Sequence, residues 1–72
     1  MIPIRFKTAT KFVKGEDNKK AKEILNRFET VNIESMEDGG FKKYIIESGN
    51  QKVMREVENQ LKKDGIGIEG AF

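Results

Sequence analysis

Apolar and polar residues alternate at the start of the chain. Every second position in residues 2–8 is apolar, a pattern typical of a strand with one buried face. The apolar set is Ile2, Ile4 and Phe6. Arg5 and Lys7 then lie on the opposite face. Whether this strand continues toward Phe12 and Val13 stays open, because Thr8-Ala9-Thr10 interrupts the alternation.

The next apolar residues recur at helical spacing, three or four positions apart. They are Ala21, Ile24, Leu25 and Phe28. Charged residues fill the positions between them, so the segment is predicted to be an amphipathic helix of about three turns. Asp17 or Asn18 is expected to cap its N-terminus, after a break at Lys14-Gly15.

A hairpin is predicted in the middle of the chain. Residues 30–36 alternate around Val31 and Ile33, and Asp38-Gly39 forms a tight-turn signal. The partner strand is expected to run from Phe41 to Ser48.

A second helix and a last strand follow the hairpin. Ser48 and Gln51 have capping-box spacing. The expected buried stripe of the helix is Val53, Met54, Val57 and Leu61. Gly65 is the expected stop, and a short final strand runs from Ile66 to Phe72.

The resulting order is strand, helix, strand, strand, helix, strand. With right-handed crossovers, this order predicts a ferredoxin-like α+β sandwich: a four-stranded antiparallel sheet in the order 4-1-3-2 with two helices on one face. The chain of 72 residues is expected to form a single domain over residues 1–72.

Composition narrows the chemistry. The sequence has no Cys and no His, which excludes disulfides, zinc sites with Cys or His ligands, and nucleophilic catalysis that uses these residues. The carboxylates of Glu34, Glu37 and Asp38 do not converge as an acid–base pair or a calcium loop requires. We therefore expect a cytoplasmic, non-enzymatic protein without a metal, a cofactor or a membrane segment.

Residues 65–70 match the glycine spacing of a dinucleotide-binding fingerprint. That fingerprint requires a helix directly after the glycines, and none is expected in the two residues that remain. An alternative interpretation is an edge strand that glycines leave bare, so that a second copy can pair with it. The residues of this possible dimer edge are Gly65, Gly67, Ile68 and Phe72.

The sheet face without helices is the main candidate surface. If Tyr44 and Ile46 point toward the helices, the face combines cations with apolar side chains; the opposite parity of this strand stays open. The candidate residues are Arg5, Lys7, Phe41, Lys43 and Ile45.

Two functions fit such a face. The first is a protein-interaction or regulatory module that forms a homodimer or binds another protein. The second is a sequence-tolerant single-stranded nucleic-acid binder, in which Lys and Arg contact phosphates and Phe41 stacks on a base. The topology is similar to that of the RNA-recognition motif, but only Gly40-Phe41 matches the third-strand motif of that family, and Lys43 replaces its second stacking ring.

Charge is unevenly distributed along the chain, although the net charge is only +2. Residues 1–28 hold eight Lys or Arg against three Asp or Glu, whereas residues 29–49 hold two against five. The acidic hairpin would repel a phosphate backbone, so the interaction module is preferred.

Overall fold

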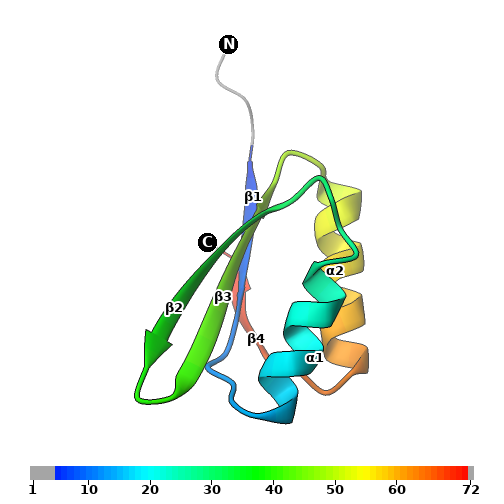
Figure 1. Cartoon of the computed structure of the whole chain (residues 1–72). Coiled ribbons are helices and arrows are strands. Elements are labelled where there is room, and N and C mark those ends of the chain that lie inside the picture. Colours follow the sequence, from blue (N-terminus) through cyan, green and yellow to red (C-terminus); the bar gives the residue numbers. More distant parts are fainter. Residues whose placement is uncertain (1–4, 72) are drawn as a thin grey trace.

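The computed structural model describes residues 5–71 and contains one sheet and two helices (Figure 1). The elements are β1 (Phe6–Thr10), α1 (Glu16–Leu25), β2 (Asn32–Asp38), β3 (Phe41–Ser48), α2 (Gln51–Lys63) and β4 (Ile68–Ala71). Residues 1–4, which include the expected strand positions Ile2 and Ile4, and Phe72 lie outside the described residues.

The four strands pair antiparallel in the order β2-β3-β1-β4. Read from the β4 edge, this is the order 4-1-3-2 that the sequence predicts. Both helices lie on one side of the sheet, and none of the described residues forms a helix on the other side (Figure 1). The predicted α+β class is therefore confirmed. No helix in the described part of the chain is long and apolar enough to span a membrane.

Strand β3 resolves the question of side-chain parity. Tyr44 and Ile46 are buried beneath the helices, while Lys43, Ile45 and Glu47 alternate with them. Because successive side chains of a strand point to opposite faces, the alternating set lies on the face without helices.

The core lies between the sheet and the two helices. Its residues are Val13, Ala21, Ile24, Leu25, Tyr44, Ile46, Met54, Val57, Leu61 and Ile66. Three of the four residues in the predicted α2 stripe are buried, and Val53 packs at its margin.

Strand β1 extends to Thr10, beyond the alternating residues 2–8, and ends before Phe12 and Val13, the continuation that the sequence left open. Its threonines are buried, and each hydroxyl has a partner: Thr8 Oγ1 donates to Glu58 Oε2 at 3.1 Å, and Thr10 Oγ1 accepts from the Tyr44 amide at 3.0 Å. A buried hydroxyl with a partner avoids most of the cost of desolvation. The alternation of apolar residues is interrupted in β1 because Thr8 and Thr10 occupy buried positions there.

The start of α1 differs from the prediction. Gly15 is the N-cap residue, with φ 61°, and no side chain caps the helix. Asn18 lies inside the first turn instead, where its Oδ1 accepts a hydrogen bond from the Tyr44 hydroxyl. The expected cap at Asp17 or Asn18 is therefore wrong, because the chain turns into the helix at a left-handed glycine.

Two more expected boundaries shift slightly. The hairpin turn is Gly39-Gly40, with φ 57° and 86°, and Asp38 forms the last strand pair with Phe41. Asn50, not Ser48, caps α2: its Oδ1 accepts from the Lys52 and Val53 amides at 2.9 and 3.4 Å. Ser48 Oγ in turn accepts from the Asn50 amide at 3.1 Å.

Replacing Asn50 by alanine tests this cap. Asn50→Ala removes the acceptor for two amides of the first turn, so we expect the free energy of unfolding to fall by about 1 kcal/mol. For a domain of this size, that loss lowers the midpoint of thermal unfolding by about 4–8 °C. Asn59→Ala, at an exposed position inside α2, is the matched control and leaves stability unchanged or slightly higher. Equal losses in both variants would contradict the assignment of the cap.

Candidate interaction surface

The open face is the side of the sheet that carries no helix. Its residues follow from the strand register, because directly opposed residues share a face. Lys7 is opposite Glu47 and Ala9 is opposite Ile45; Met36 is opposite Lys43. All five residues that the sequence predicts for this surface fall on the open face: Arg5, Lys7, Phe41, Lys43 and Ile45.

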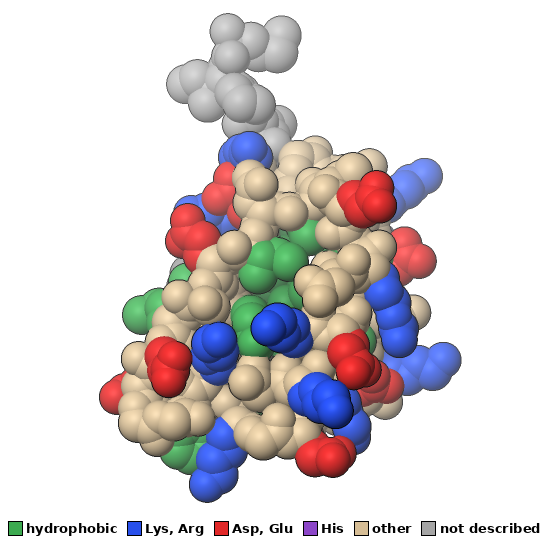
Figure 2. Space-filling model, viewed as in Figure 1, with side chains coloured by type: hydrophobic (Ala, Val, Ile, Leu, Met, Phe, Trp, Pro, Cys, Tyr) green, Lys and Arg blue, Asp and Glu red, His purple; other side chains and the backbone are tan. Residues whose placement is uncertain are grey.

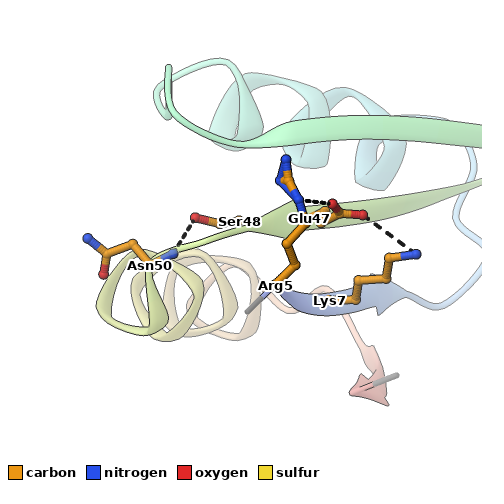
Figure 3. Close-up of polar contacts among 5 residues, drawn as sticks. All are labelled: Arg5, Lys7, Glu47, Ser48 and Asn50. Atoms are coloured by element: carbon orange, nitrogen blue, oxygen red, sulfur yellow. Dashed lines mark hydrogen bonds and ion pairs between the residues drawn. The ribbon is translucent and has the colours of Figure 1, made fainter. Parts of the chain in front are cut away.

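Arg5, just before β1, and Lys7, in β1, share an acidic partner on β3, Glu47. The sequence did not predict this pairing. Arg5 Nε lies 2.8 Å from Glu47 Oε1, and Lys7 Nζ lies 3.5 Å from Glu47 Oε2 (Figure 3). Both side chains reach across toward the same carboxylate, which is about three-quarters buried, with 24% of its side chain exposed. This corner of the open face is therefore partly neutralised.

Lys43 is held more tightly. Its ammonium pairs with Glu69 on β4 and lies 5.6 Å from the centre of the Phe12 ring. Only 12% of the Lys43 side chain is exposed. The prediction that Lys43 is displayed as a phosphate-binding cation is thus not supported by its position.

Three large hydrophobic side chains gather at the hairpin end of the open face, and we call them the apolar end. They are Phe12, Met36 and Phe41, with exposed fractions of 42%, 52% and 39%. The Lys14 ammonium lies 5.1 Å from the centre of the Phe41 ring. Of the three, only Phe41 was predicted as a site residue.

Phe12 reaches the open face because the chain bulges just after β1, before the isolated bridge of Val13 with Lys42. Val13 exchanges two backbone hydrogen bonds with Lys42, of 2.8 and 2.7 Å, whereas the Tyr44 amide is bonded to the Thr10 side chain. Two residues, Lys11 and Phe12, therefore oppose Lys43 alone. An extra residue in one strand reorients the side chains that follow, and no simple alternation in the sequence reveals it.

The described β2 residues of the open face include the carboxylates Glu34 and Asp38, which share the face with Ile45 and Phe41 by register. The other side has Arg5 and Lys7, together with Glu69 of β4, which pairs with Lys43. A hollow of about 350 Å³ lies between these sides, lined in part by Lys7, Glu34 and Ile45.

The residues predicted for a dimer edge are placed differently than expected. Gly65 lies outside β4: it ends α2 with φ 81°, donates to the Lys62 carbonyl at 3.0 Å, and the next residue, Ile66, donates to the Leu61 carbonyl at 2.9 Å. This is the Schellman arrangement of a helix end. Gly65 is thus required by the backbone at the helix end.

Gly67 precedes β4 and is not bare. Its carbonyl accepts from the Lys11 amide at 2.9 Å, and a Cβ at position 67 would lie only 3.0 Å from the aliphatic part of the Lys11 side chain. Ile68 begins β4 and packs against the core, and Phe72 lies outside the described residues. The bare strand face expected at Gly65 and Gly67 is therefore wrong, although β4 does form one edge of the sheet.

The comparisons with protein-family models, with curated proteins and with solved structures find no match for this chain. Within residues 5–71, no group of three or more Asp or Glu side chains is arranged to hold a metal ion. The surface has to be interpreted from its own geometry.

Tyr44 lies on the helix side of β3 and does not contribute a ring to the open face. Burial raises the pKa of Tyr44, because the phenolate form would lose its hydration. In the unfolded chain the same group ionises near its usual pKa of about 10. The unfolded state therefore loses this proton first as the pH rises.

Tyr44 is the single tyrosine of the chain, so the absorbance of phenolate reports on it alone. We expect the folded protein to reach half-ionisation at a higher pH than the urea-unfolded protein. Since the raised pKa stabilises the fold below pH of about 10, the free energy of unfolding falls as the pH rises above that value. A titration midpoint that is equal in both states would contradict the burial of this hydroxyl.

Proposed function

We propose that this chain is a non-enzymatic, ferredoxin-like interaction module that associates with a second copy of itself through the open face. The element order and the strand order support the ferredoxin-like arrangement. The observation that carries the proposal is the apolar end, where three large hydrophobic side chains are 39–52% exposed beside each other on one face. Exposed hydrophobic clusters of this kind are typical of interaction surfaces.

The open face is complementary to itself. A two-fold rotation about an axis parallel to β3 exchanges the two sides of the sheet and leaves its two ends in place. The apolar end of one copy then meets the apolar end of the other, with Met36 against Phe12. The same rotation sets the β1 side, with Arg5 and Lys7, over the β2 side with Glu34. Such an interface is closed and isologous, which is the commonest symmetry of homodimers.

Self-association would stabilise a domain of this small size. A chain of 72 residues without disulfides or zinc ligands has a small core, and such domains rarely gain more than about 3–5 kcal/mol from the core alone. Burial of the apolar end between two copies would add hydrophobic stabilisation that a monomer lacks, and would make stability depend on concentration.

Single-stranded nucleic acid is the alternative occupant of this face, and the charges favour it less. A phosphate would have to compete with Glu47 for Arg5 and Lys7 and with Glu69 for Lys43. The carboxylates of β2 would repel the backbone of the nucleic acid, and such repulsion weakens a contact that depends mainly on charge.

Replacing Met36 by glutamate tests the proposed dimer. Met36 is half exposed, so the fold should tolerate Met36→Glu, but in the dimer the change places a charge in an apolar contact. In analytical ultracentrifugation over a dilution series, we expect the unmodified chain to have twice the mass of the monomer at high concentration. We expect Met36→Glu to remain a monomer under the same conditions.

Ile33→Glu is the matched control, because Ile33 is on the same strand and 39% exposed but lies on the opposite face. The control should still form the dimer. A monomeric mass of the unmodified chain at every concentration, or equal loss of the dimer in both variants, would refute the proposed interface. Binding of a labelled single-stranded oligonucleotide at about 50 mM salt, lost in Phe41→Ala, would support the alternative.

A further inference from the structure

Strand β2 forms the edge of the sheet opposite β4, and all seven of its residues are exposed. Among the described residues it pairs with β3 alone. Figure 1 shows β2 along the outer margin of the sheet, on the side away from β4. Its outer backbone edge is therefore open to a further strand.

The register identifies the backbone groups that this edge presents. Asp38 and Phe41 flank the two-residue turn, so they form a hydrogen-bonded pair, and such pairs recur at every second residue. The residues of β2 between those pairs direct their N–H and C=O groups away from β3. They are Ile33, Ser35 and Glu37. This assignment agrees with β3, where Lys42 exchanges its hydrogen bonds with Val13 on the other side.

The side chains of β2 are apolar and acidic on both faces of the sheet. Ile33 and Glu37 lie on the helix side, while Glu34 and Met36 lie on the open face. The strand holds three carboxylates and no Lys or Arg. Figure 2 shows acidic side chains interleaved with hydrophobic ones along the margin where β2 runs, so β2 itself offers carboxylates and apolar contacts to an added strand.

We propose that β2 binds an extended, basic peptide segment of another protein as an additional antiparallel strand. Main-chain hydrogen bonds to Ile33, Ser35 and Glu37 would give the segment its register, and side chains would give it specificity. Because directly opposed residues share a face, the segment needs a defined pattern. From its N-terminus, this pattern is basic opposite Glu37, apolar opposite Met36, unrestricted opposite Ser35, basic opposite Glu34 and apolar opposite Ile33.

The same carboxylates disfavour a second β2 as the added strand. Edge-to-edge pairing of two copies would bring together two strands with three carboxylates each and no cation. Like charges across a strand pair are destabilising, and acidic side chains are a common protection against edge-to-edge association. Charge complementarity therefore selects a basic segment.

This inference goes beyond the proposed self-association and concerns a different surface. The outer edge of β2 lies in the plane of the sheet, so it stays accessible when two open faces pack together. Glu34 and Met36 lie on the open face and belong to both surfaces, whereas Glu37 lies on the helix side and belongs to the edge alone. Glu37→Lys should therefore weaken peptide binding and leave the dimer intact. Failure of one proposal can thus be distinguished from failure of the other.

A short synthetic peptide with the stated pattern is the probe, titrated into the full chain and followed by NMR and amide hydrogen exchange. At saturation we expect slower exchange, by up to about tenfold, of the outward amides of Ile33, Ser35 and Glu37, because each gains a hydrogen bond. The amides of Glu34 and Met36 already bond to β3 and should change little. Unchanged exchange of the three outward amides in the saturated complex would overturn the proposal.

Two matched pairs separate strand addition from simple charge attraction. Glu37→Lys should weaken peptide binding at least about tenfold, whereas Glu56→Lys, an equal charge change at an exposed position of α2, should not. N-methylation of the peptide residue opposite Ser35 blocks a hydrogen bond to β2 and should abolish the gain in protection, while N-methylation of the residue opposite Glu34 should leave it. Equal effects within either pair would refute an added strand at β2.

Discussion

The burial of Ile46 in the middle of β3 orients the entire sheet. This side chain is fully buried beneath the helices and is opposed by Thr8 on one side and Ile33 on the other. Because the side-chain period of a strand is two, a slip of one residue would turn Lys43, Ile45 and Glu47 into the core and expose Tyr44. Burial of Lys43 and Glu47 would cost the desolvation of two charged groups, and exposure of Tyr44 would lose its hydrophobic burial. The observed register is therefore far more stable than its neighbours. The composition of the open face is thus a consequence of core packing on the other side.

A small core that contains polar residues depends on local hydrogen bonding. Thr8, Thr10 and Ser48 are buried, and each hydroxyl takes part in a hydrogen bond, with Glu58, the Tyr44 amide and the Asn50 amide. Among the described residues, no buried side-chain nitrogen or oxygen lacks a partner. These contacts join β1 to α2, β1 to β3, and β3 to the start of α2. The buried polar groups therefore connect the sheet to the helix layer, and their hydrogen bonds offset the loss of hydration.

Elements with strong local periodicity could be predicted from the sequence. The bounds of β3, the stripe of Met54, Val57 and Leu61, and the strand order all follow from alternation, helical spacing and right-handed connections. What could not be predicted depends on tertiary placement. The bulge that presents Phe12 depends on the bonds between Val13 and Lys42 and on the bond from the Tyr44 amide to the Thr10 side chain. The pairing of Lys43 with Glu69 likewise joins residues whose proximity only the folded sheet creates. Met36 was accessible to prediction, because the hairpin register already places it opposite Lys43.

The central position of β1 has a consequence for the order in which the structure forms. The β2–β3 hairpin joins neighbouring segments, whereas β1 pairs with β3 and with β4, which comes from the far end of the described chain. Contacts between distant segments require closure of long loops and slow the search for the native state. During synthesis, the hairpin can form while β4 is still within the ribosome, and the sheet is completed only after Ile68–Ala71 has emerged. Until then β1 lacks one neighbour, so the interval before β4 emerges is when a nascent chain of this topology is most exposed to mispairing.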